Sequence, residues 1–382
     1  MGVRGANFPA VIRGIVAIFW YGVQTYFAST AIALLINTLF TIESTATFLG
    51  MTAVDWTAFV LVWLFQIYLF WQGIDWITRF LNWAGPLVYL VMFALLAVIW
   101  YKAGGGLLDA VGTIFSGQSD YEGSSFSAFV AIVGTMIAYF AAVVINFGDF
   151  SRFVRSESEM KKGNLLGLPV SLAIFSFIAL FVTAGTVVLF GEALTNPTDI
   201  IERVDNTFLT VIAAITFFAA TIGINLVANF IPPAYDIANL APSKINFRMG
   251  GLITAVIAFF IGGLWVSVVS QVGIAGFVDT LGAVLAPVYG IMIVDYYLIK
   301  GGNLDIQDLF SADPKGKYYF DGGWNKKAIL GFCVAGVFSI GTVWVPALEA
   351  LSGYGWVIGA LLGGSIHWLL MRGDALAAAQ RA

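Results

Sequence analysis

Long apolar runs separated by short polar segments repeat along the whole chain. A helix needs about 20 apolar residues to cross roughly 30 Å of hydrocarbon, and ten runs reach or approach that length. The pattern predicts an all-α membrane protein without a soluble domain, so that residues 1–382 form a single polytopic membrane domain. The ten predicted spans are Phe8–Leu39, Trp56–Trp71, Leu81–Tyr101, Phe126–Phe147, Leu165–Phe190, Thr207–Ile231, Gly250–Val269, Ile274–Ile299, Ala328–Ala347 and Tyr354–Met371.

Lysine and arginine are distributed unequally between the two sides of the predicted bundle. If the N-terminus is cytoplasmic and the spans alternate in direction, 16 of the 18 basic residues are cytoplasmic and only Lys102 and Arg203 are outside. Short cytoplasmic loops of membrane proteins carry such an excess. We therefore expect a multi-pass protein of the cell (inner or plasma) membrane with both termini in the cytoplasm and residues 300–327 as a cytoplasmic loop.

Composition narrows the class of protein further. Only 10% of residues are charged, whereas a soluble domain carries about 25%. A single cysteine, Cys333, and a single histidine, His367, argue against a disulfide framework or a metal cluster built from these residues. His367 lies close to the end of a span, where solvation is easy, so a role in proton relay is not favoured. No catalytic set or basic patch is visible, so we expect neither an enzyme, nor a cofactor, nor a nucleic-acid partner.

Two pairs of residues stand out because they place amides deep within apolar spans. Trp20 and Gln24 lie four residues apart on one face of the first span, and Asn225 and Asn229 repeat this spacing in the sixth. An indole and amides can stack on a planar heterocycle and hydrogen-bond its edge. Amides that bond only to neighbouring helices are the alternative explanation.

The order of the spans bears on that choice. The first and sixth spans are five apart and therefore run in opposite directions. In inverted five-helix repeats with a site at their interface, the two amide faces would lie opposite each other. Membrane lipid and a small planar heterocycle are the expected partners, and the oligomeric state stays open.

Four segments resemble the nucleobase:cation symporter family 1, whose members include permeases for hydantoins, allantoin, uracil, cytosine and purines. In chain order they are GVRGANFPAVIRGIVAIFWYGVQTYF, INFGDFSRF, GINLVANFIPPAYDIANLAP and VDYYLIKGGNLDIQDLF. The resemblance implies a LeuT-type fold of twelve helices, ten of them in two inverted repeats. It also implies import of a nucleobase or related ureide or hydantoin by alternating access, driven by a coupling cation.

The resemblance implies substrate-binding roles for particular residues. Trp20 matches the stacking tryptophan of the family's third helix and Gln24 the amide beside it. Asn229 matches the substrate-binding asparagine of the eighth helix, with Asn225 one turn before it. Phe140 matches an aromatic position of the sixth helix, so the substrate would lie between Trp20 and Phe140.

Two departures from the family pattern change the expectations. The match begins at the family's third helix, so helices 3 to 12 are expected here and the first two have no counterpart. Because these two helices are missing, the alternative to a transporter is a non-transporting solute-binding protein or an inactive fragment. Sodium-coupled members use hydroxyl groups on the eighth helix, where this chain has Gly223 and Ile224, and Ala220 could offer only a carbonyl. A hard cation needs several oxygen ligands, so we expect a proton rather than sodium.

Overall fold

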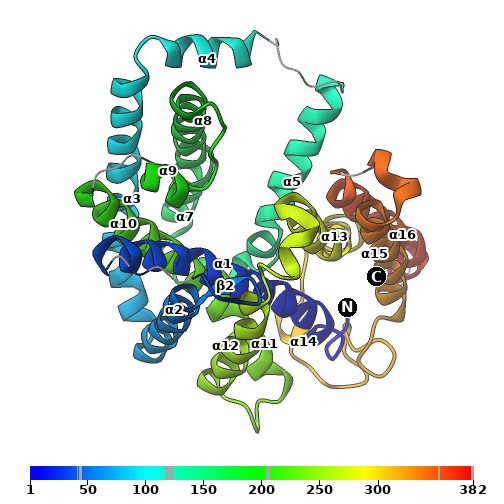
Figure 1. Cartoon of the computed structure of the whole chain (residues 1–382). Coiled ribbons are helices and arrows are strands. Elements are labelled where there is room, and N and C mark those ends of the chain that lie inside the picture. Colours follow the sequence, from blue (N-terminus) through cyan, green and yellow to red (C-terminus); the bar gives the residue numbers. More distant parts are fainter. Residues whose placement is uncertain (41, 43–44, 117–123, 204–206, 352, 380–382) are drawn as a thin grey trace.

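The computed structural model describes residues 1–40, 42, 45–116, 124–203, 207–351 and 353–379, and these form a bundle of long helices (Figure 1). Each of the ten predicted spans falls on a helix. These are α1 (Asn7–Phe40), α2 (Ala53–Gln72), α3 (Ile74–Ala103), α5 (Ser125–Ile145), α7 (Glu157–Leu165) with η1 (Leu166–Val170) and α8 (Ser171–Phe190), α10 (Thr207–Asn225) with η2 (Leu226–Phe230) and α11 (Ile231–Leu240), α12 (Phe247–Gly263), α13 (Gly273–Val294) with η4 (Asp295–Ile299), α15 (Lys326–Trp344) and α16 (Gly355–Ala379).

Short elements that the apolar pattern does not predict connect these helices. They are a hairpin of β1 (Thr47–Phe48) and β2 (Met51–Thr52), α4 (Gly106–Phe115), α6 (Phe147–Ser151), α9 (Pro197–Arg203), η3 (Val269–Val272), α14 (Ile306–Leu309) and η5 (Pro346–Leu351). Within the described residues, eight helical segments are long and apolar enough to span a membrane. The other two predicted spans are α12, which has only 17 residues, and α16, which carries His367 and Arg372.

Local sequence explains where several helices begin. The α2 helix starts after Thr52, whose side chain accepts from the Asp55 N–H while the Asp55 carboxylate accepts from the Thr52 N–H. This reciprocal capping satisfies donors that a helix start leaves free. The sixth span was expected to end at Ile231, but the helix continues to Leu240. Pro232 and Pro233 occupy the first turn of α11, directly after the π-helical segment η2, and the fixed φ of proline is compatible with a first helical turn.

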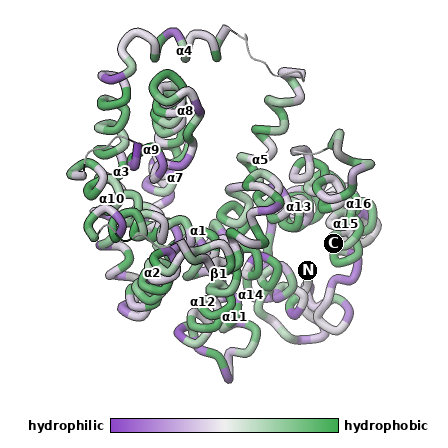
Figure 2. Tube along the Cα trace, viewed as in Figure 1, coloured by the Kyte–Doolittle hydropathy of each residue, from purple (hydrophilic) through white to green (hydrophobic). Residues whose placement is uncertain are grey.

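The α1 helix runs through the middle of the bundle and separates two core clusters (Figure 1). On one side Tyr21 packs with α2, α10, η2, α11 and α12, and on the other Val23 packs with α5 and α13. Contact with α12 is close, because a Cβ on Gly262 would lie 2.4 Å from the Gly22 carbonyl oxygen. Small residues permit such approach between membrane helices. The α3, α4 and α5 helices form an arch beside α8, and green apolar residues cover most of the long helices (Figure 2).

The N-terminus and the polar segment at residues 300–327 lie on the same side of the bundle. The Asn325 N–H donates to the Met1 carbonyl over 2.7 Å, and the Val3 N–H donates to the Tyr318 carbonyl over 3.2 Å. This agrees with the expectation that both face one compartment. The cytoplasmic assignment and the single-domain boundaries stay predictions, and Arg381 lies outside the described residues.

Candidate functional site

One stripe of α1 carries three polar or aromatic side chains between the two core clusters. Trp20 and Gln24 follow Arg13 by seven and eleven residues. At about 100° of rotation per residue, all three side chains point within about 20° of the same direction. Tyr21 and Val23, which enter the opposite clusters, lie about 80° to either side of it. This stripe is therefore the boundary along which the two halves of the core meet.

A matching stripe runs along the helix that faces α1. Asn229 and Asp236 follow Asn225 by four and eleven residues. Between the two asparagines the chain changes from α-helix to the π-helical η2, and such π segments are frequent at functional sites. The widened turn keeps Asn225 and Asn229 on the α1 side, where both are at least 95% buried.

Asn225 is the fully buried centre of an amide network. Its Nδ2 lies 2.8 Å from the Gln66 Oε1, 3.1 Å from the Tyr21 carbonyl oxygen and 3.2 Å from the Thr25 Oγ1. Gln66, which reaches in from α2, donates from its Nε2 to the Thr25 Oγ1 over 2.9 Å, and that hydroxyl donates to the Tyr21 carbonyl over 2.7 Å. The network therefore joins three helices at a point where no water need enter.

Asn229 connects this network to Gln24. Its Nδ2 donates to the Asn225 Oδ1 over 3.0 Å and to the Gln24 Oε1 over 3.1 Å. Neither the Gln24 Nε2 nor the Asn229 Oδ1 is hydrogen-bonded to any described residue. The network thus ends in one donor group and one acceptor that lie side by side and have no partner in the described part of the chain. The two amides that the sequence pairs do meet, and their role in binding stays a prediction.

Aromatic rings surround Trp20, one turn before Gln24. Its ring is edge-on to Tyr139, with centroids 5.2 Å apart, and to Phe277 at 5.1 Å. Phe140, the residue expected to oppose Trp20, contacts Tyr139 edge-on at 5.0 Å. Among the described ring contacts it is therefore Tyr139 that touches Trp20, and Phe140 stands one residue further along α5, half-buried.

The three positions expected to form a weakened ion site point in different directions. Gly223 packs against α3, where an added Cβ would lie 2.8 Å from the Leu81 Cδ2. Ile224 is 53% exposed and turns away from α1, while Ala220 is half-buried. Among the described residues no group of three or more His, Cys, Asp or Glu side chains could hold a metal ion.

Sequence reasoning missed Tyr21, Thr25 and Gln66 as members of the network. Gln66 gave a usable signal, because an amide inside an apolar span is costly without a partner. His367 was expected near water but is fully buried, and its Nε2 lies 3.1 Å from the Asp295 Oδ1. That expectation was wrong because α16 packs tightly against α13 and η4.

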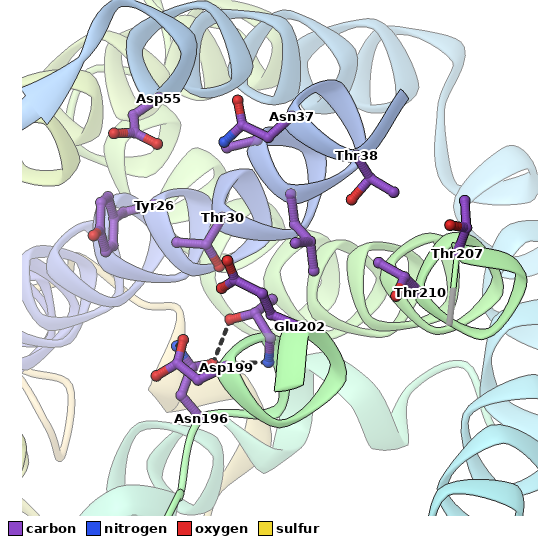
Figure 3. A pocket seen from close by; sticks show the side chains of 13 residues that line it. Tyr26, Thr30, Asn37, Thr38, Asp55, Asn196, Asp199, Glu202, Thr207 and Thr210 are labelled. Carbon is purple, nitrogen blue, oxygen red and sulfur yellow. Dashed lines mark hydrogen bonds between the residues drawn. The ribbon is translucent and has the colours of Figure 1, made fainter. Parts of the chain in front are cut away.

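A polar cavity of about 490 Å³ opens toward the other end of α1 (Figure 3). Tyr26, Thr30 and Asn37 of α1 line it together with Asp55 of α2, and across from them lie Asp199 and Glu202 of α9 (Figure 3). Tyr26, Thr30 and Asn37 lie about 120–160° around the helix from Gln24. Leu34 and Thr38 lie closer in angle but about 15 and 21 Å further along the helix axis, so the cavity is separate from the amide network. Its carboxylates give this region a negative potential that favours cations.

Sequence comparisons match the chain to one family of permeases. Residues 1–370 match the family model described as permease for cytosine/purines, uracil, thiamine, allantoin. The allantoin permease of Bacillus subtilis is 35% identical over 97% of this chain and 75% of its own length. The purine-uracil permease NCS1 of Arabidopsis thaliana is 30% identical over 97% of this chain and 63% of its own length.

Solved structures of a similar protein share the arrangement of helices. Mhp1, a nucleobase-cation-symport-1 family transporter solved in a closed conformation with bromovinylhydantoin bound, superposes with a TM-score of 0.75 at 23% identity, covering 98% of this chain and 77% of its own. The inward-facing conformation of Mhp1 superposes with a TM-score of 0.70.

The fold and the comparisons define a multi-pass membrane transporter of the LeuT type rather than an enzyme. The chain belongs to the family of permeases for cytosine/purines, uracil, thiamine and allantoin. The resemblance drawn from its motifs is thereby confirmed, and the transporter is favoured over a non-transporting solute-binding protein.

Proposed function

We propose that the chain imports a neutral planar heterocycle with an amide edge, such as a nucleobase, a hydantoin or a cyclic ureide, by cation symport. One observation carries this proposal. Gln24 Nε2 and Asn229 Oδ1 are a donor and an acceptor without a partner among the described residues, on two amides joined by a 3.1 Å hydrogen bond. An N–H next to a C=O on a ring edge would satisfy both at once.

Stacking would supply the second part of recognition. Trp20 lies one turn from Gln24 on the same stripe of α1, so a ring bonded to the amides would lie against the indole. Such aromatic contacts contribute about 0.5–1.5 kcal/mol beyond buried area. The names of the relatives, allantoin permease and purine-uracil permease, fit this chemistry, because their substrates carry amide edges. The hydantoin bound to Mhp1 carries one as well.

Uptake into proteoliposomes tests the substrate class. Radiolabelled uracil, allantoin and hydantoin form the panel, and each is compared with an analogue whose ring N–H is methylated. We expect at least one parent compound to be taken up and its methylated analogue to lose most of its uptake, because Asn229 Oδ1 would lose its donor. Equal uptake of parent and analogue would refute the pose, and binding without uptake would favour the solute-binding protein.

For the coupling cation we propose a proton rather than sodium. The placement of Ala220, Gly223 and Ile224 supports this, because none of these side chains offers an oxygen and Ile224 faces away from the bundle. Uptake should therefore follow an imposed pH gradient and change little when choline replaces sodium. Strong sodium stimulation at constant pH would overturn this part alone.

We propose further that both termini face the cytoplasm. The basic residues support this orientation. A protease-accessible tag at either end of the chain should then be protected in intact cells and cleaved in inverted vesicles. Cleavage in intact cells would reverse the orientation.

A further inference from the structure

A second cavity, of about 320 Å³, lies at the N-terminal end of the α1 stripe. Arg13 of α1 and Asp236 of α11 line it together with Asn146 and Asp149, which lie where α5 ends and α6 begins. Arg13 precedes Gln24 by eleven residues, or about 16 Å along the helix axis. The cavity therefore lies on the same face of α1 as the amide network but well apart from it.

Three buried side-chain atoms at this cavity have no hydrogen-bond partner among the described residues. They are Nε and Nη2 of Arg13 and Oδ1 of Asn146. Arg13 is only 2% exposed, and its side chain makes one hydrogen bond to the described part of the chain, from Nη1 to the Asp236 Oδ2 at 2.9 Å. Buried polar groups without partners cost free energy and are rare without a reason. Two donors and one acceptor beside one cavity thus lack protein partners among the described residues, and each of the three atoms is itself buried in this conformation.

The charges around the cavity are already paired. Asp236 is paired with Arg13, and the Asp149 Oδ1 lies 2.9 Å from Nη2 of Arg152. Each charged side chain among the described residues that line the cavity therefore has a partner of opposite charge, and the lining favours neither an anion nor a cation. A neutral solute that carries both a C=O and an N–H matches what is free: the C=O would accept from the Arg13 fork, and the N–H would donate to Asn146.

We propose that this cavity is a second binding subsite for the same class of neutral, amide-edged heterocycle, occupied on the cytoplasmic side of the Gln24–Asn229 site. The subsite rests on the proposed function for its ligand class. Its volume is at the lower end of the range found for small-molecule pockets. Because the two stripes carry Gln24–Asn229 at one level and Arg13–Asp236 at another, a solute leaving the first site would meet the second on the same helix face.

Equilibrium binding of radiolabelled allantoin to the protein in nanodiscs tests the subsite, with empty nanodiscs subtracted. We expect two molecules bound per chain, one more weakly than the other. Asn146→Leu should weaken the second site at least tenfold and leave the first unchanged, whereas Asn229→Ala should weaken the first site and leave the second unchanged. Asn303→Leu, in the exposed loop, is the matched control and should keep both sites.

Gly148→Val is a second variant that leaves every polar group in place. Gly148 lines the cavity and has no atom within 4 Å of an added Cβ, so the new side chain would partly fill the cavity. It too should abolish only the weaker site. The number of allantoin molecules bound per wild-type chain tests the subsite even if a variant fails to fold.

One bound molecule in the wild type at saturation overturns the subsite while leaving the proposed function standing. The same holds if Asn146→Leu retains both sites. If the protein binds none of allantoin, uracil and hydantoin, the proposed function and the subsite are both overturned.

Discussion

Replacing Asn229 with alanine isolates the contact on which the proposed site depends. The substitution removes the free Oδ1 that would accept from the substrate, and it leaves the Gln24 Oε1 without the 3.1 Å donor that now holds it. A ligand N–H that loses its acceptor in a buried site costs about 1–3 kcal/mol. The dissociation constant should therefore rise by about 5-fold to 150-fold.

The variant should keep its fold, because Asn225 retains its bonds to Gln66, Thr25 and the Tyr21 carbonyl. Binding is measured by titrating labelled substrate into protein in nanodiscs, and thermal unfolding is followed in parallel. Asn37→Ala is the matched control. The Asn37 amide lines the polar cavity of about 490 Å³, so its loss should leave the affinity for substrate unchanged. A dissociation constant for Asn229→Ala within twofold of the wild type, in folded protein, would show that the reasoning about this amide is wrong.

Three further predictions concern stacking, packing and the polar cavity. Trp20→Ala should weaken binding by about 1 kcal/mol or more, whereas Trp20→Phe keeps most of the stacking; equal affinity in both would remove Trp20 from the site. Gly262→Val should destabilise by about 1–3 kcal/mol through overpacking against α1 and lower the melting temperature, while Gly85→Ala, with no atom within 4 Å, should not. Thr210→Cys, made in a Cys333→Ser chain, should react about fourfold faster with a cationic than with an anionic thiol reagent, because three carboxylates line the same cavity; equal rates would contradict the negative potential.

Helix placement was largely predictable, because lipid leaves each apolar run only one way to satisfy its backbone. The errors in helix boundaries arose where the sequence signals for the end of a helix are weak or ambiguous. The sixth span was predicted to end at Ile231, yet Pro232 and Pro233 lie in the first turn of α11 and the helix continues to Leu240. The π segment before them gives no signal in the apolar pattern, since it changes the number of residues per turn without changing hydrophobicity.

The sequence alone determined that the protein lies in a membrane, where its spans run and which two amide pairs they carry. These features depend on residues near one another along the chain. Only the tertiary structure decided that Gln24 meets Asn229, that Gln66 completes the network and that Tyr139 rather than Phe140 touches Trp20. Those contacts join residues far apart in the chain, and their distances depend on how helices cross and rotate. The same holds for Arg13, whose unpaired atoms can be seen only when α5 and α11 are packed against α1.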